Sequence, residues 1–514
     1  MKKIKLYITA FLAVALFAIG CDKGFDDVNT DKVNFTTLDP AFVMNSSILS
    51  VTERGSRAYL TQTFTTIQWL LCPFGNDLVG ANYNQWADKQ DDPWGSFYQN
   101  SVPRIVEVVL RTKDDPAKSN LYNAARIWKA YVFQQLTDYY GDVPYYEAGL
   151  GYFEQNTKPV YNTQQEIYKD LLKELDEASA ALDPAKGAIA GEILYGGNVV
   201  RWKKFGYSML LRTAMRLSKV DPATAQTYVT KAIAGGLMES NDDNAWIKHT
   251  PEFSNRLGGE ISGTEKGNYY VQKAFVDFLK STNDPRLGPF THRYVGATTS
   301  AGQTNAIRTK DPDKQIGMPL GYDNLSINSP DVLSAHGVVH LYDFSQFDWN
   351  LFFITSSPEF HCTYGQTQLL LAEAIIRGWA TGSAAEAFAN AVKSNMALLA
   401  QFNTAATVPA AAIDAYIAAH PLNVSTTVAS LKQINEEYWV GSFPNATEAW
   451  ANFRRSGYPA LAPNPYPGSQ IPGKFITRHK YPDRERITNR DNLEQAESRL
   501  GGNGMDLRVW WDKQ

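Results

Sequence analysis

The chain has 514 residues, of which 44% are hydrophobic and 20% are charged, a composition typical of a folded globular protein with a large core. The formal net charge is −4, and removal of residues 1–20 with their three lysines would take it to −7. This acidic balance disfavours nucleic acid or an anionic lipid surface as a partner, because both bind basic faces. The 12 Trp and 27 Tyr exceed the usual need of a core and suit a stacking surface.

The first twenty residues form the first predicted element. Met1–Gly20 has a basic start and then an apolar run too short to span a membrane, which is the layout of a secretory signal peptide. Leu16–Cys21 is similar to a bacterial lipobox, so we expect Cys21 to be acylated and residues 21–39 to form a polar tether. The alternative is a plain secreted protein with a stray cysteine.

Aromatic residues are frequent between Asp39 and Asn100. In Asn82–Trp94 the rings of Tyr83, Trp86 and Trp94 stand among Asn, Gln and Asp residues. Sugars stack their C–H faces on such rings, and their hydroxyls bond to amides and carboxylates. We therefore predict ligand contacts in an insert around residues 70–98. The alternative for Trp94 is that it begins the next buried helix.

Two helices joined by an aromatic loop follow. The first carries an apolar stripe at three- and four-residue steps that ends before Gly141 and Pro144. Thr163 and Glu166 have the spacing of a capping box that opens the second. Pro184 closes it. The apolar positions of the two helices are Leu121, Ala124, Ala125, Trp128, Tyr131, Val132, Leu136, Ile167, Leu171, Leu175 and Ala178.

Helical patterns return on both sides of the middle of the chain. In Asn198–Lys219, Trp202, Phe205, Gly206 and Met209 match the spacing of a tetratricopeptide repeat, in which the small residue admits a partner helix. Further helical runs are predicted at Gln366–Gly378, Ser383–Gln401 and Leu431–Trp450. The frame is thus predicted to be mainly α. We expect the closing Val509–Asp512 to pack onto the body.

Helical periodicity fails between His249 and His361, where Gly, Ser, Thr, Asn and Pro are frequent. A long irregular stretch inside a compact fold is more often a functional insert than disorder. Trp349 lies in this second insert, and we predict that it contacts ligand. The other rings of the insert are Tyr269, Tyr270, Phe344, Phe347, Phe352 and Phe353.

Two motifs partly match known phosphate-binding or metal-binding patterns. Gly468–Lys474 nearly spells a phosphate loop, but Pro472 removes an N–H and Phe475 replaces the hydroxyl that would hold magnesium. His336 and His340 have a ligand spacing, yet Gly-Val-Val between them favours a strand, so structural histidines are the better interpretation. We predict no metal and no cofactor.

Two further questions concern carboxylates and thiols. Asp138 and Asp142 could be imagined as a glycosidase pair, but a loop-capping role is adequate for Asp142, and an enzyme is not supported. Cys72 and Cys362 could form a disulfide in an exported protein or remain buried thiols, and the sequence leaves both open.

Seven stretches of the chain carry a family resemblance: TDYYGDVPYYEA, PVYNTQQEIYKDLLKELDEA, VVRWKKFGYSMLLRTAMRLSKVDP, TYGQTQLLLAEAIIRGWATGSAAEAF, EAWANFRRSGYPAL, YPDRERITNRDNLEQA and RVWWD. They resemble the SusD/RagB-like outer-membrane lipoproteins of Bacteroidetes, specifically the SusD-like nutrient-binding subgroup, over nearly the whole mature chain.

The resemblance implies a SusD-like fold over residues 40–514: four tetratricopeptide-like helix pairs that carry loop-rich, aromatic-rich inserts around 70–98 and 249–361. It also implies a surface-exposed lipoprotein, held in the outer membrane by its N-terminal lipid, that binds an oligosaccharide or peptide nutrient. Its implied partner is a SusC-like TonB-dependent β-barrel transporter, for which it acts as a non-catalytic lid. The alternatives are a secreted carbohydrate-active hydrolase on a helical frame and a structural repeat adaptor.

Overall fold

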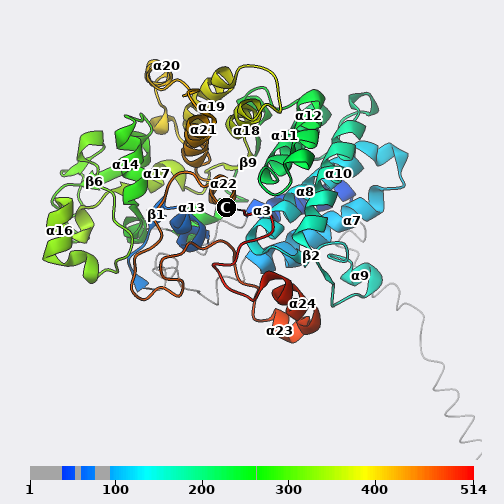
Figure 1. Cartoon of the computed structure of the whole chain (residues 1–514), viewed down its shortest axis with the longest axis horizontal. Coiled ribbons are helices and arrows are strands. Elements are labelled where there is room, and N and C mark those ends of the chain that lie inside the picture. Colours follow the sequence, from blue (N-terminus) through cyan, green and yellow to red (C-terminus); the bar gives the residue numbers. More distant parts are fainter. Residues whose placement is uncertain (1–37, 53–58, 76–92, 262, 514) are drawn as a thin grey trace, which may run out of the picture.

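The computed structural model describes residues 38–52, 59–75, 93–261 and 263–513, and helices dominate it (Figure 1). The first predicted helix pair is present as α8 (Ser119–Tyr140) and α10 (Gln164–Ala181). α8 ends at Gly141, whose φ of 85° favours glycine. At the start of α10, Thr163 Oγ1 accepts from the Glu166 amide at 3.2 Å, and the Glu166 carboxylate accepts from the Thr163 amide at 3.0 Å. The capping box is therefore confirmed.

Four helix pairs form the frame, which confirms the mainly α, tetratricopeptide-like prediction. Neighbouring pairs pack through α10 on α11, α11 on α18 and α18 on α21. Ahead of them, α3 (Pro40–Thr52) packs on α7 (Val102–Thr112), and α7 packs on α8. The pairs are α8 with α10, α11 (Val199–Arg216) with α12 (Pro222–Gly235), α18 (Tyr364–Ile376) with α19 (Ala384–Leu398), and α21 (Thr427–Gly441) with α22 (Ala446–Ser456).

The run predicted at Leu431–Trp450 is in fact divided between α21 and α22. Pro444 lies in the break between them. A proline has no N–H to give to the preceding turn, which explains why one apolar pattern yields two helices.

The small residue of the repeat motif lies where two helices approach closely. A Cβ built on Gly206 of α11 would fall on Ser179 Oγ of α10 and come within 2.8 Å of Ile127 Cδ1 of α8. Glycine at this position therefore allows three helices to meet, as the repeat spacing predicts.

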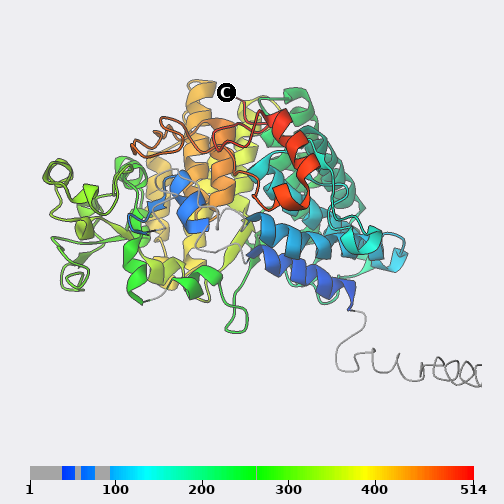
Figure 2. The ribbon, with the colours of Figure 1, turned by 90° about the horizontal axis from the view of Figure 1, so that it is seen from below.

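The insert at 249–361 forms the left-hand end of the molecule in Figures 1 and 2. It holds most of a sheet with the strand order β1-β5-β8-β6-β7. The insert was predicted to be irregular, and strands of two to four residues are too short to show an alternating pattern. The strands are β1 (Leu70–Leu71), β5 (Tyr270–Val271), β6 (Thr291–Tyr294), β7 (Arg308–Thr309) and β8 (Gln346–Phe347).

Short helices complete this insert. Its small apolar core is separate from the main one and includes Leu71, Tyr270, Met318 and Phe344. Residues 330–340 do not form the strand favoured by the Gly-Val-Val run, because His336 ends α16 and His340 caps a 3-10 turn. The helices are α13 (Arg256–Glu260), α14 (Lys273–Ser281), α15 (Leu287–Phe290), α16 (Pro330–His336) and α17 (Trp349–Phe352).

The last part of the chain packs back onto the first helix pair. Trp511 is buried and donates from its indole Nε1 to Asp138 Oδ1 at 2.9 Å, so the tail is anchored as predicted. Asp138 also faces Arg216, whose guanidinium bonds to Glu448 Oε2 at 2.6 Å. The remaining elements are α9 (Gly151–Glu154), β2 (Val143–Pro144) with β3 (Tyr161–Asn162), β4 (Ala245–Ile247) with β9 (Glu359–Cys362), α20 (Ala410–Ala419), α23 (Glu485–Thr488) and α24 (Arg490–Leu500).

None of the helices within the described ranges is both long enough and apolar enough to cross a bilayer. Cys72 and Cys362 are both buried and are not joined by a disulfide, so of the two possibilities left open by the sequence the structure has the unbridged one.

Candidate functional site

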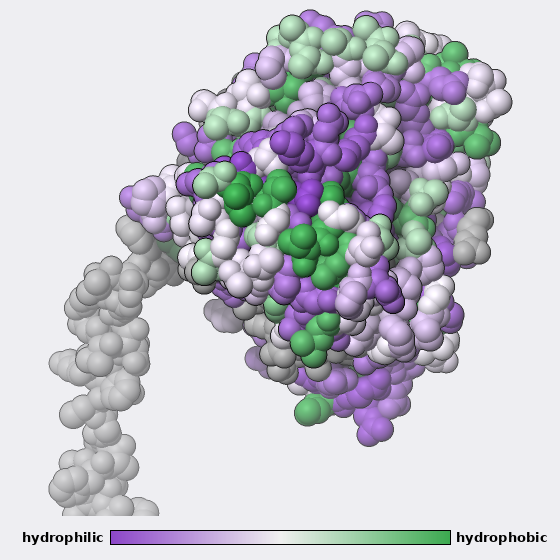
Figure 3. All heavy atoms as spheres, turned by 90° about the vertical axis from the view of Figure 1, so that its left-hand side faces the viewer, coloured by the Kyte–Doolittle hydropathy of each residue, from purple (hydrophilic) through white to green (hydrophobic). Residues whose placement is uncertain are grey.

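A pocket of about 470 Å³ opens in the insert, beside the central strands of its sheet. Figure 3 faces this end of the molecule, where apolar residues form separate patches among polar ones. The wall combines aromatic rings with amide groups, an imidazole and one lysine, Lys266, a mixture that suits a polar ligand. The lining residues are Gly263, Lys266, Gly267, His292, Tyr294, Ser300, Gln303, Gln346, Phe347, Trp349 and Asn350.

Trp349 forms part of the pocket wall at the first turn of α17. Its ring packs at 5.1 Å from that of Tyr269 and 4.7 Å from that of Phe353, and the residue is only 2% exposed. Its indole Nε1 has no hydrogen-bond partner in the described part of the chain. A buried N–H without an acceptor is costly, so this donor marks a place where a ligand oxygen would be stabilising.

His292 on β6 also has a buried nitrogen without a hydrogen-bond partner in the described ranges. It is 8% exposed and stacks edge-on against Tyr294 at 5.2 Å, and its Nδ1 meets no partner among the described residues. Burial, reinforced by the positive charge of Arg308, lowers the pKa of His292 to about 4. The imidazole is therefore neutral at pH 7 and offers one donor and one acceptor.

The polar side chains around the opening are held by hydrogen bonds to the insert itself. The Gln346 amide donates to the Gly267 carbonyl at 2.6 Å, and the Gln303 amide donates to the Tyr342 carbonyl at 2.9 Å. Lys266 Nζ donates to Asn350 Oδ1 at 3.2 Å. Each of these groups has remaining hydrogen-bonding capacity that can be turned toward a ligand.

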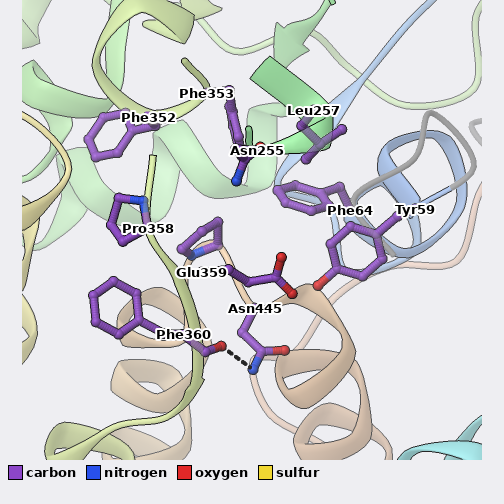
Figure 4. Close-up of a pocket in the computed structure, with 11 residues that line it drawn as sticks. Tyr59, Phe64, Asn255, Leu257, Phe352, Phe353, Pro358, Glu359, Phe360 and Asn445 are labelled. Atoms are coloured by element: carbon purple, nitrogen blue, oxygen red, sulfur yellow. Dashed lines mark hydrogen bonds between the residues drawn. The ribbon is translucent and has the colours of Figure 1, made fainter. Parts of the chain in front are cut away.

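A second, smaller pocket is lined in part by Phe352 at the end of α17 and by Phe353 after it (Figure 4). Its volume is about 40 Å³, room for a few water molecules rather than a sugar ring. Phe64, Phe352, Phe353 and Phe360 form its walls, and Asn445 donates to the Phe360 carbonyl at 3.2 Å. Since Phe353 also packs on Trp349, this aromatic cluster supports the larger pocket from behind.

Of the four residues predicted to contact ligand, the structure describes Trp94 and Trp349, and Trp349 lines the larger pocket. Trp94 is 3% exposed and packed among Tyr98, Tyr140 and Tyr161, so it takes the alternative place at the start of a buried helical segment. Tyr83, Trp86 and the lipidation candidate Cys21 lie outside the described residues, and the ligand contacts assigned to these aromatic residues remain predictions.

Sequence reasoning missed His292, Gln303 and Gln346. A lone histidine and two glutamines carry no motif, and only the pairing of β6 with β8 brings His292 opposite Gln346.

The other candidates are structural. Asp138 is buried and accepts from the Tyr168 hydroxyl at 2.5 Å. Asp142 accepts from the backbone N–H of Gln164 at 2.9 Å at the start of α10. His340 stacks on Tyr342 at 5.0 Å. No group of three or more His, Cys, Asp or Glu in the described ranges has the arrangement of a metal site.

Comparisons with known proteins agree with this architecture. A family model described as "Starch-binding associating with outer membrane" matches residues 32–482. A solved chitin-binding protein is 31% identical, with a TM-score of 0.81, over 93% of this chain and 100% of that one. A Bacteroidetes SusD-like protein is 26% identical, with a TM-score of 0.80, over the same shares of the two chains.

A chitin-binding SusD homologue from Flavobacterium johnsoniae is 22% identical, with a TM-score of 0.73, over 92% of this chain and 98% of that one, and at this identity it supports the fold alone. Comparison with curated protein sequences gave no match. The family model and the fold together show that the chain belongs to the SusD-like family.

Proposed function

We propose that this protein is a non-catalytic, surface-exposed lipoprotein that binds a nutrient glycan in the pocket of the insert. The observation that carries the proposal is that two residues lining one pocket, Trp349 and His292, each have a buried ring nitrogen, Nε1 and Nδ1, without a hydrogen-bond partner among the described residues. The family description and the chitin-binding relative support a polysaccharide as the ligand class. A peptide is the alternative ligand class.

In this proposal the ligand is held by direct contacts, with no covalent step. A ligand hydroxyl or acetamido oxygen accepts from Trp349 Nε1 after a small movement of the rim side chains Gln303 and Asn350. His292, which is neutral, completes a second hydrogen bond. Binding of an uncharged saccharide fits a wall in which aromatic groups outnumber unpaired charges.

The cellular role rests on the resemblance and on the N-terminal sequence. We propose that residues 1–20 are removed, that Cys21 carries lipid, that residues 21–39 form the tether, and that residues 40–514 act as one domain. That domain would serve as the lid of a TonB-dependent β-barrel transporter, and closure on loaded ligand would be its whole activity.

Two measurements test these proposals. Titration calorimetry of the full mature chain with maltohexaose, N-acetylchitohexaose and other hexasaccharides is expected to show binding, and analysis after long incubation is expected to show unshortened glycans. Shortened products would favour the hydrolase alternative. Affinity purification from the native outer membrane is expected to recover a large β-barrel near one-to-one, and recovery of the protein alone would contradict the lid role.

A further inference from the structure

A second large pocket lies outside the insert, between the start of α10 and the C-terminal tail. Its volume is about 550 Å³. Its lining residues include the last two of α24 and part of the C-terminal tail. Figure 2 shows α24 and the chain end on one side of the molecule and α3 on the other. The lining residues are Asp142, Thr163, Gln164, Gln165, Arg499, Leu500, Arg508, Val509, Trp510, Asp512 and Lys513.

A buried carboxylate in this wall has one unused oxygen. Asp512 is 1% exposed, and its Oδ1 accepts from Arg508 at 2.5 Å. Its Oδ2 has no hydrogen-bond partner within the described ranges. Burial raises the pKa of Asp512, against the opposing effects of Arg454 and Arg508, which shows that the carboxylate lacks full compensation. A hydrogen-bond donor on a ligand would supply the missing compensation to Asp512 Oδ2.

Apart from the exposed Lys513, the charged residues of the pocket form two pairs. Arg499 Nε donates to Asp142 Oδ2 at 2.6 Å, and Asp142 Oδ1 accepts from the Gln164 amide at 2.9 Å. Arg508 and Asp512 form the second pair. Because both arginines already have a carboxylate partner and Lys513 is exposed to solvent, the wall does not select strongly for an anion, and neutral hydrogen-bonding groups fit it better.

An aromatic ring completes the set. Trp510 is half-buried and packs against Tyr168, with 6.4 Å between the ring centroids, so part of its surface faces solvent. Gln165, which lines the same pocket, is exposed. An exposed indole face stacks on the C–H face of a pyranose ring, and the neighbouring amide can bond to its hydroxyls.

We infer that this pocket, built around Trp510, Arg508 and Asp512, is a second saccharide-binding site, separate from the pocket of the insert. A vicinal diol matches an Asp–Arg pair, because one hydroxyl donates to Asp512 Oδ2 while its neighbour accepts from the free N–H groups of Arg508. The ligand class is taken from the proposed function. Two sites on one chain would let the protein hold a long glycan at two points, which strengthens binding beyond either site alone.

The test is the number of sites per chain, measured by titration calorimetry of the full mature protein with the same hexasaccharide panel. We expect two sites in the unmodified protein. Trp510→Ala and Asp512→Asn should each weaken one of them at least tenfold while the other stays unchanged, and Trp510→Phe should retain most of the affinity. The control is Trp379→Ala, which removes another half-buried indole that lies outside both pockets.

The variants also separate this inference from the proposed function. If Trp349→Ala abolishes all binding and Trp510→Ala changes nothing for every hexasaccharide of the panel, the second site is overturned and the proposed function stands. If binding depends on Trp510 but not on Trp349, the second site stands and the insert pocket is wrong. Gln165→Ala changes an exposed position and should not disturb folding. It should weaken the same site that Trp510→Ala weakens.

Discussion

The Arg455 guanidinium donates two hydrogen bonds, of 2.6 and 2.7 Å, to the Glu373 carboxylate, although 82 positions separate the two residues in the sequence. The pair is buried and joins α22 to α18, two helices of different pairs in the frame. Glu373→Gln leaves the Arg455 charge without its partner, and we expect it to lower the free energy of unfolding at pH 7 by about 3 kcal/mol. Chemical denaturation measures this. Lys432→Ala, which removes the 3.8 Å pairing of the exposed Lys432 with the half-buried Glu436, should cost less, under about 1 kcal/mol.

The same pair predicts a dependence of stability on pH. Burial alone would raise the pKa of Glu373, but Arg455 and Arg377 outweigh it and lower the pKa to about 2. A carboxyl with a depressed pKa stabilises the fold above its unfolded pKa, and that contribution is lost as the pH falls from about 4.5 to about 2. The gap in unfolding free energy between the unmodified protein and Glu373→Gln should therefore close over this range. A gap that stays constant would contradict the role of the charge.

Gly206 provides a test of helix packing in the frame. Gly206→Ala places a methyl group against Ser179 and Ile127, and the resulting overpacking should destabilise the protein by about 1–3 kcal/mol despite the better helix propensity of alanine. The matched control is Gly259→Ala in α13, where an added Cβ meets nothing within 4 Å. That control should be neutral or slightly stabilising. Equal effects of the two substitutions on the melting temperature would argue against the close approach of α10 and α11.

His292 predicts how ligand binding responds to acid. Since its pKa is lowered to about 4, the imidazole stays neutral from pH 6 to 8, and glycan affinity should be constant there. As the pH falls through about 4, protonation puts an unpaired charge in the pocket wall, and affinity should fall severalfold. Calorimetry at a series of pH values measures this. In His292→Gln the acid-induced loss should disappear, and its persistence would assign the loss to another group.

The helical frame was accessible from the sequence because its signals are local. The capping box at Thr163, the repeat spacing around Gly206 and the three- and four-residue stripe of α8 each depend on residues within one or two turns. The insert was not accessible in this way. Its sheet joins Leu70 to Val271, a pairing across about two hundred residues that no short window contains.

The candidate site was only partly predictable for the same reason. Trp349 could be named because tryptophan in an irregular stretch is conspicuous. His292 and Gln346 gain their meaning only from the pairing of β6 with β8. Trp94 was chosen for its polar neighbours, but its ring packs against Tyr140 of α8 and Tyr161 of β3, contacts that depend on the tertiary fold.

The central claim is that the insert pocket binds a glycan, and the most direct test compares two tryptophan substitutions. Trp349→Ala removes the indole donor of the pocket, whereas Trp246→Ala removes a half-buried indole of β4 that stacks on Phe360 outside it. Both variants should first be shown to melt cooperatively. With a hexasaccharide that binds the unmodified protein, calorimetry should show at least tenfold weaker binding at the insert site for Trp349→Ala and little change for Trp246→Ala. Unchanged binding in a folded Trp349→Ala variant would contradict the account.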